Sequence, residues 1–75
     1  MVRLFDIKEI GGNIQFICVP EGKLENAFVV VIDKKTKKIV NDVDMTVDIS
    51  QAISRLSYYI DNGKELPKTE ASVWY

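Results

Sequence analysis

Residues 3–19 read Arg-Leu-Phe-Asp-Ile-Lys-Glu-Ile-Gly-Gly-Asn-Ile-Gln-Phe-Ile-Cys-Val, two runs of strand-forming residues joined by a glycine pair. Glycine readily adopts the positive φ that a two-residue hairpin turn requires, so Gly11-Gly12 predicts a β-hairpin. This turn would place Phe5 opposite Cys18, and directly opposed residues share a face of the sheet. The resulting register predicts a core face that carries Phe5, Ile7, Ile14, Phe16 and Cys18.

A second hairpin is predicted after the first. The apolar run at 27–32 has the length of a buried strand, and a lysine-rich turn separates it from a second strand-forming segment at 38–43. With Lys35-Thr36 at the tip, Ile32 would pair with Ile39. One face of this hairpin would collect Phe28, Val30, Ile32, Ile39 and Val43. The turn is similar to the Asp-x-x-Thr-x-Lys hairpins of many unrelated small domains, and this similarity identifies no family.

From residue 48 the spacing of the apolar residues changes from the period of a strand to that of a helix. The sequence Asp-Ile-Ser-Gln at 48–51 predicts a capping box, in which Asp48 accepts hydrogen bonds from the first-turn amides. Asn62-Gly63 predicts the end of the helix, because glycine tolerates the left-handed conformation there. At roughly 100° per residue, one apolar stripe would comprise Ile49, Ala52, Ile53, Leu56, Tyr59 and Ile60.

The predicted fold class is α+β. The two hairpins would form a four-stranded antiparallel sheet, and the helix that follows would lie across one face as the second layer of a two-layer sandwich. Residues 69–75 alternate weakly between apolar and polar, which leaves a short C-terminal strand open. A chain of 75 residues has room for one small domain, 1–75, near the lower size limit of independent stability.

The composition argues against an enzyme. The chain has no histidine, and this removes the commonest general base and the commonest metal ligand. Its single cysteine, Cys18, is predicted to lie among aromatic core residues, away from any base or cation that would activate it. We therefore expect no catalytic residue and no cofactor.

Three aspartates, Asp42, Asp44 and Asp48, form an acidic cluster in the sequence. A divalent cation takes carboxylate oxygens from such clusters, but the segment lacks the glycine and the final glutamate of an EF-hand loop. Acidic residues are also favoured at the positive end of a helix dipole. We interpret the cluster as a strand end followed by a helix start and leave metal binding at these residues open.

The chain is expected to be cytoplasmic. Charged residues occur too early for a signal peptide, and no apolar run approaches the ~20 residues of a membrane-spanning helix. A lone cysteine excludes a secreted scaffold built on internal disulfides. The composition suits a bacterial or phage product, and no membrane partner is expected.

Nucleic acid is the alternative partner. Lys34, Lys35, Lys37 and Lys38 place four positive charges at one hairpin tip, and a basic β-ribbon can follow phosphates. Against this interpretation, 10 basic and 11 acidic side chains give a formal charge of -1, and neither an aromatic residue nor an arginine accompanies the lysines. Lysines also occur in solvated turns, where they discourage edge-to-edge pairing.

The second face of the predicted sheet is too apolar to be left in water. It would present Leu4, Ile17, Val19, Val29, Val31 and Val40, interrupted by Asp6, Lys8, Gln15 and Asp42. One helix covers one face only, and an antiparallel sheet with a wet face normally alternates cleanly between apolar and polar residues. A contiguous apolar patch of this kind marks a contact surface. Its cover would be the C-terminal tail, a second copy of the chain or another protein.

The first hypothesis is therefore a non-catalytic protein-binding or regulatory module: an inhibitor, subunit or adaptor that acts by surface complementarity. A homodimer is the expected assembly, because a two-fold axis lets one surface cover itself. The predicted contact surface combines sheet residues with aromatic residues, which bury much area with few rotors. It comprises Ile17, Val19, Val29, Val31, Val40, Tyr58, Trp74 and Tyr75.

Overall fold

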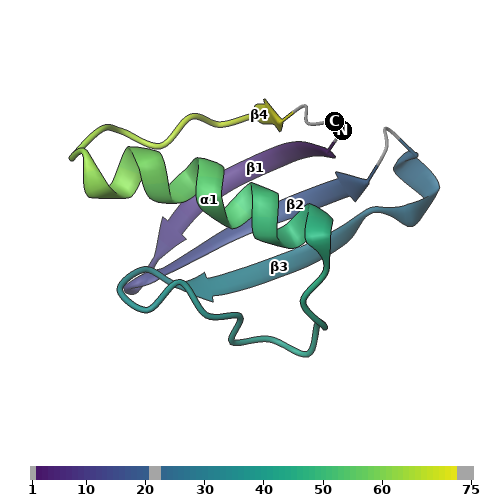
Figure 1. Cartoon of the computed structure of the whole chain (residues 1–75), viewed down its shortest axis with the longest axis horizontal. Coiled ribbons are helices and arrows are strands. Elements are labelled where there is room, and N and C mark those ends of the chain that lie inside the picture. The colour runs from purple at the N-terminus through teal and green to yellow at the C-terminus, as the bar shows by residue number, and fades with distance from the viewer. Residues whose placement is uncertain (1, 21–22, 73–75) are drawn as a thin grey trace.

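Three antiparallel strands from the first half of the chain and one helix make up most of the structure (Figure 1). The computed structural model describes residues 2–20 and 23–72. Its elements are β1 (Val2–Ile10), β2 (Asn13–Pro20), the 3-10 helix η1 (Leu24–Asn26), β3 (Phe28–Asp33), α1 (Val47–Asp61) and β4 (Glu70–Ser72). The strands lie in the order β3-β2-β1-β4, each antiparallel to its neighbours, and α1 crosses one face of the sheet. The predicted α+β layout of a sheet followed by one helix is confirmed.

The first hairpin turns at the predicted glycine pair. Gly11 and Gly12 have φ values of 54° and 85°, and Ile10 pairs with Asn13 across them. These left-handed torsions cost glycine little because it has no Cβ. The turn therefore follows directly from the local sequence.

The register of this hairpin departs from the prediction beyond Lys8. Phe5 pairs with Ile17 instead of Cys18, because β1 has one extra residue between Phe5 and Lys8. Asp6 lies in this β-bulge with a φ of 51°, in the left-handed region. A bulge opposes two residues on one strand to one residue on its partner, so the alternation of side chains shifts by one residue.

The bulge changes which face of β1 lies in the core. Val2 and Leu4 are fully buried, whereas Phe5 is 37% exposed on the opposite face. The predictions that Phe5 belongs to the core and Leu4 to the second face are therefore wrong. Ile7, on the other side of the bulge, is buried as predicted.

The second predicted hairpin does not form, and neither does the predicted four-stranded sheet of two hairpins. The turn after β3 closes, and Ile32 bridges Ile39 as expected, but the segment 38–43 is not a strand. The carbonyl of Asn41 accepts a hydrogen bond from the backbone N–H of Val43 at 2.9 Å, so the chain turns away from β3 at this point. Ile39 and Val43 still pack against the core, as predicted.

The side chain of Asn41 takes the place of the missing strand at the edge of β3. Its Oδ1 accepts from the N–H of Val31 at 3.0 Å, and its Nδ2 donates to the carbonyl of Val29 at 2.9 Å. The N–H of Val40 donates to the carbonyl of Val31 at 2.8 Å. These bonds cover backbone groups that would otherwise offer a free strand edge.

The helix α1 begins at a different cap from the one predicted. Thr46 is the N-cap, and its hydroxyl oxygen accepts from the N–H of Ile49 at 3.2 Å. Asp48 lies inside the first turn, where its negative charge interacts favourably with the positive end of the helix dipole. The assignment of Asp48 as the cap is wrong because Thr46 offers the same type of acceptor two residues earlier.

The C-terminal end of α1 is as predicted. Gly63 has a φ of 64°, and its N–H donates to the carbonyl of Ile60 at 3.2 Å. The N–H of Lys64 donates to the carbonyl of Tyr59 at 2.9 Å. This pair of bonds is a Schellman motif, which satisfies carbonyls that the helix leaves open.

The core lies between α1 and one face of the sheet. From α1 it receives Ile49, Ala52, Ile53 and Leu56, and from the first three strands it receives Val2, Leu4, Ile7, Ile14, Phe16, Cys18, Val30 and Ile32. Tyr59 and Ile60, the last two residues of the predicted stripe, are half-buried. Among the described residues, no helix is both long enough and apolar enough to cross a membrane.

The short strand β4 adds to the free edge of β1. The hydroxyl of Tyr59 donates to Oε2 of Glu70 at 2.6 Å, and Nε of Arg55 lies 3.5 Å from the same oxygen. These contacts hold β4 against α1. Before β4, the carbonyl of Lys68 accepts from the N–H of Ile7 at 3.1 Å.

We expect the left-handed conformation at Asp6 to be visible in stability. Asp6→Val should lower the free energy of unfolding by about 1–2 kcal/mol more than Asp6→Gly, because a β-branched residue disfavours positive φ. Both variants lose the exposed contact between Asp6 and Lys8, so that loss cancels in the comparison. Urea unfolding measures the difference, and equal stabilities would mean that β1 has no bulge at Asp6.

The amide of Asn41 provides a second test. Asn41→Ala should lower the free energy of unfolding by about 1–2 kcal/mol, because two hydrogen bonds to β3 are lost. The matched control is Asn26→Ala, since Asn26 is exposed and no side-chain hydrogen bond is seen for it in the described part of the chain. Thermal unfolding that ranks the two variants together would contradict the role of Asn41.

Candidate interaction surface

The sheet face opposite α1 carries a group of apolar side chains, which we name the outer sheet face. The bulge at Asp6 places Phe5 in one row with Ile17 and Val29, because these residues pair across the three strands. Val31 lies on the same face of β3 as Val29, and Val40 is hydrogen-bonded beside Val31. The outer sheet face is thus defined by Phe5, Ile17, Val29, Val31 and Val40.

These side chains are substantially open to solvent. Phe5 is 37% exposed, Val29 43% and Val40 53%, while Ile17 and Val31 are half-buried. Figure 1 shows α1 on one face of the sheet only, so this exposure follows from the two-layer architecture. Large apolar residues that are exposed side by side on a sheet are suited to contact with another apolar surface.

The structure changes the membership of the predicted contact surface. Val19 is only 3% exposed and so contributes little accessible area. Phe5, which the sequence analysis placed in the core, joins the surface instead. The exposure of Phe5 could have been predicted only by predicting the bulge. Asp6 is a weak sequence signal of that bulge, because aspartate tolerates a positive φ better than most residues.

Tyr58 lies on α1, in the other layer of the structure. It is 50% exposed, its ring centroid is 5.0 Å from the Nζ of Lys64, and its hydroxyl accepts from that ammonium at 3.2 Å. Tyr58 therefore belongs to a different surface from the outer sheet face. Trp74 and Tyr75, the other aromatic residues of the predicted surface, lie outside the described residues.

Two of the four predicted phosphate-binding lysines make ion pairs within the chain. The Nζ of Lys34 lies 3.0 Å from Oε1 of Glu9, and the Nζ of Lys37 lies 3.1 Å from Oδ1 of Asp61. Lys35 and Lys38 are exposed. Pairing with carboxylates lowers the positive potential of the tip, which weakens the argument for nucleic-acid binding.

The carboxylate of Asp33 has a structural role in the same turn. It accepts hydrogen bonds from the backbone N–H groups of Thr36 and Lys35, at 3.0 Å and 2.7 Å. These two bonds hold the pKa of Asp33 below its usual value of 3.8. The charge of Asp33 is therefore used to organise the turn.

The aspartates at 42, 44 and 48 are not brought together as a metal site. Within residues 2–20 and 23–72, the structure contains no group of three or more side chains of the ligating types that could hold a metal ion. Asp42 and Asp44 are exposed, and Asp48 lies in the first turn of α1.

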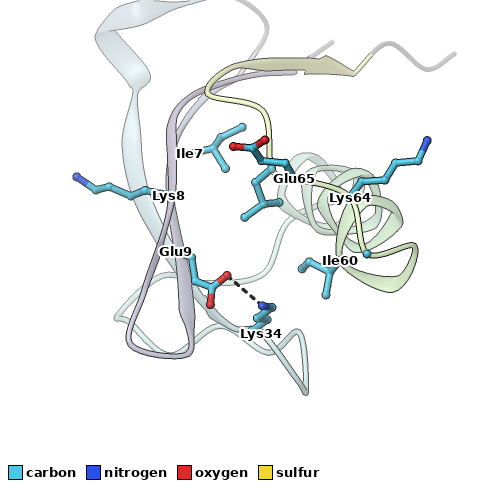
Figure 2. A pocket seen from close by; sticks show the side chains of 9 residues that line it. Ile7, Lys8, Glu9, Lys34, Ile60, Lys64 and Glu65 are labelled. Atoms are coloured by element: carbon cyan, nitrogen blue, oxygen red, sulfur yellow. Dashed lines mark hydrogen bonds and ion pairs between the residues drawn. The ribbon is translucent and has the colours of Figure 1, made fainter.

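A groove that the sequence analysis missed lies between β1 and the segment that follows α1 (Figure 2). It has a volume of about 400 Å³. One wall is formed by residues 7–9 of β1 and the other by residues 63–66, with Ile60 and Lys34 completing the lining. The walls come from opposite ends of the chain, so no local sequence pattern indicates the groove.

Cys18 is buried in the core, as predicted. Burial, with a smaller contribution from the negative charge of Asp48, raises the pKa of its thiol from 9.0 to about 11. A thiol in this environment is a poor nucleophile, because the thiolate is the reactive form. The structure thus gives Cys18 a packing role.

Two measurements test this environment. At pH 8 only about one thiol in a thousand would be ionised, so a thiol reagent should modify the native protein much more slowly than the unfolded protein. Since the folded pKa is raised, the protein should also lose stability as the pH rises above 9.0 toward 11. Cys18→Ala should make that alkaline loss smaller but not abolish it, because the hydrogen bond to Glu70 also raises the pKa of Tyr59. Rapid modification of the native chain would contradict the core placement.

Comparisons with known proteins do not identify a relative. No family model, no curated protein and no solved structure matches the chain. The outer sheet face and the groove are therefore the two features of the molecule that bear on its function.

Proposed function

We propose that the protein is a non-catalytic protein-binding module that acts through the outer sheet face, as an inhibitor, subunit or adaptor. The observation that carries this proposal is the exposure of Phe5, Val29 and Val40 on the uncovered side of the sheet, at 37%, 43% and 53%. Burial of one such side chain is worth roughly 1.5–3 kcal/mol when it is complete. A contact that covers the whole face would therefore contribute strongly to association.

The first occupant that we propose is a second copy of the chain. A self-complementary apolar face is covered most simply by itself across a two-fold axis. The hydrogen bonds from Asn41 and Val40 to β3 support face-to-face contact over strand addition at that edge, because they occupy its backbone groups. The cytoplasm is the proposed location, which agrees with the free, buried thiol of Cys18.

The chemistry of the face supports binding over catalysis. Polar side chains flank the apolar ones on this face. The exposed side chains of Arg3 and Lys8 extend from β1, and Lys8 pairs with Gln15, which in turn pairs with Val31. A buried apolar centre with a polar rim is the usual anatomy of a protein interface. An enzyme would need converging acid, base or nucleophile groups.

Light scattering at micromolar concentration tests the proposed dimer. The wild-type chain should give twice its 8.5 kDa mass, and Val29→Lys should return it to the monomer, because a charge in the centre of the contact is costly to bury. The exposure of Val29 makes this variant compatible with the fold.

The matched control is Val47→Lys, which adds the same charge at an exposed position on α1, away from the outer sheet face. It should remain dimeric. A monomeric wild type, or dimers of both variants, would refute a second copy on the outer sheet face. Retention of the wild type on heparin at low salt, lost when the tip lysines are replaced, would instead favour nucleic-acid binding.

A further inference from the structure

The groove between β1 and residues 63–66 contains an open strand edge. β4 pairs only with the start of β1, and the carbonyl of Lys68 accepts from Ile7 further along. Beyond Ile7, β1 continues to Ile10 with β2 on one side and with the groove on the other. The last part of β1 is therefore an edge, in contrast to β3, whose edge is covered by Asn41.

The peptide groups of Glu9 face this open side. A two-residue turn closes on a hydrogen-bonded pair, so the backbone groups of Ile10 point toward Asn13 of β2. Successive residues of a strand direct their N–H and C=O to alternate sides, and those of Glu9 therefore point away from β2. Within the described residues, no hydrogen bond occupies them on that side.

Apolar side chains form the floor of the groove. Ile7 is 6% exposed, and Ile60 and Leu66 are half-buried and pack against the core. An extended peptide that pairs with Glu9 would direct alternate side chains toward this floor. The floor would therefore favour an apolar side chain at the peptide position that faces α1.

The carboxylate of Glu65 is a charge in the groove without a partner among residues 2–20 and 23–72. Figure 2 shows the side chains of Lys8 and Lys64 pointing away from the groove, while Glu9 is paired with Lys34 at 3.0 Å. The carboxylate of Glu65 points across the groove toward Ile7, and no ion pair or hydrogen bond is seen for it in the described part of the chain. A basic side chain on the occupant would complement Glu65.

We propose that this groove binds an extended peptide segment of a partner protein, added as a strand to β1 at Glu9. The segment carries an apolar side chain over Ile60 and Leu66 and, two residues away on the same face, a lysine or arginine that pairs with Glu65. Residues i and i+2 of a strand point the same way and lie about 7 Å apart. This binding mode is strand addition, in which main-chain hydrogen bonds supply affinity and pockets for alternate side chains supply specificity.

The probe is a random heptapeptide library displayed on phage and selected against the full chain. We expect the selected peptides to contain an apolar residue followed two positions later by a basic one. Selection against Glu65→Lys should replace the basic residue by an acidic one, because the charge of the groove is reversed. Recovery of no peptide, or of the same peptides with both proteins, would overturn the proposal.

The backbone contact has its own matched pair of variants. Glu9→Pro removes the N–H that faces the groove, and proline is tolerated on an edge strand when its nitrogen faces outward. Glu9→Thr keeps the N–H, and both variants lose the ion pair with Lys34. The best selected peptide should bind Glu9→Pro about tenfold more weakly than Glu9→Thr, as expected for the loss of a hydrogen bond.

Circular dichroism confirms that both variants are folded before binding is measured by fluorescence anisotropy. Equal affinities for the two folded variants would show that no strand is added at Glu9. If Glu9→Pro does not fold, amide chemical shifts of the wild type decide: peptide-induced changes must fall on residues 7–9 and 63–66. Binding abolished by Val29→Lys would place the peptide on the outer sheet face and overturn this proposal while leaving the proposed function intact.

Discussion

The β-bulge at Asp6 is the constraint on which the rest of the structure depends. It lets a single strand bury Val2 and Leu4 before the bulge and Ile7 after it, all against the same helix. Without the extra residue, strict alternation would bury one of these sets and expose the other. The core of so small a domain has few residues to spare, and the left-handed conformation of Asp6 is what keeps both sets inside.

The same bulge creates the outer sheet face. Because Leu4 points inward, Phe5 must point outward, where it joins Ile17 and Val29 in one row across three strands. An exposed phenylalanine in the centre of a sheet is therefore a consequence of burying its neighbours. The proposed contact surface and the core are two results of one local distortion.

The backbone groups at the edge of β3 are covered by a side chain, whereas those at the end of β1 are open. At β3, an asparagine side chain imitates a strand and covers the backbone groups of Val29 and Val31. At β1, the strand β4 covers only the first residues, and the rest of the edge opens into a groove with an apolar floor. The uncovered end of β1 therefore offers backbone groups for strand addition beside a pocket.

The sequence by itself determined the elements whose signals are local. Gly11-Gly12 specified a hairpin because only glycine adopts two successive positive φ angles easily, and the spacing from Ile49 to Leu56 specified one face of a helix. Gly63 ended that helix for the same steric reason. The burial of Cys18 and of Phe16 followed from β2, a strand without irregularity.

Tertiary structure decided the features that depend on distant residues. The segment 38–43 has the composition of a strand, but Asn41 bonds to β3 through its side chain, and the chain must turn toward the start of α1. The bulge at Asp6 forms because it allows Leu4 and Ile7 to be buried together against α1. The pairing of residues within the hairpin does not predict this burial. Glu9 and Glu65 both line the groove. They are far apart in the sequence, and only the packing of α1 on the sheet brings them to the same site.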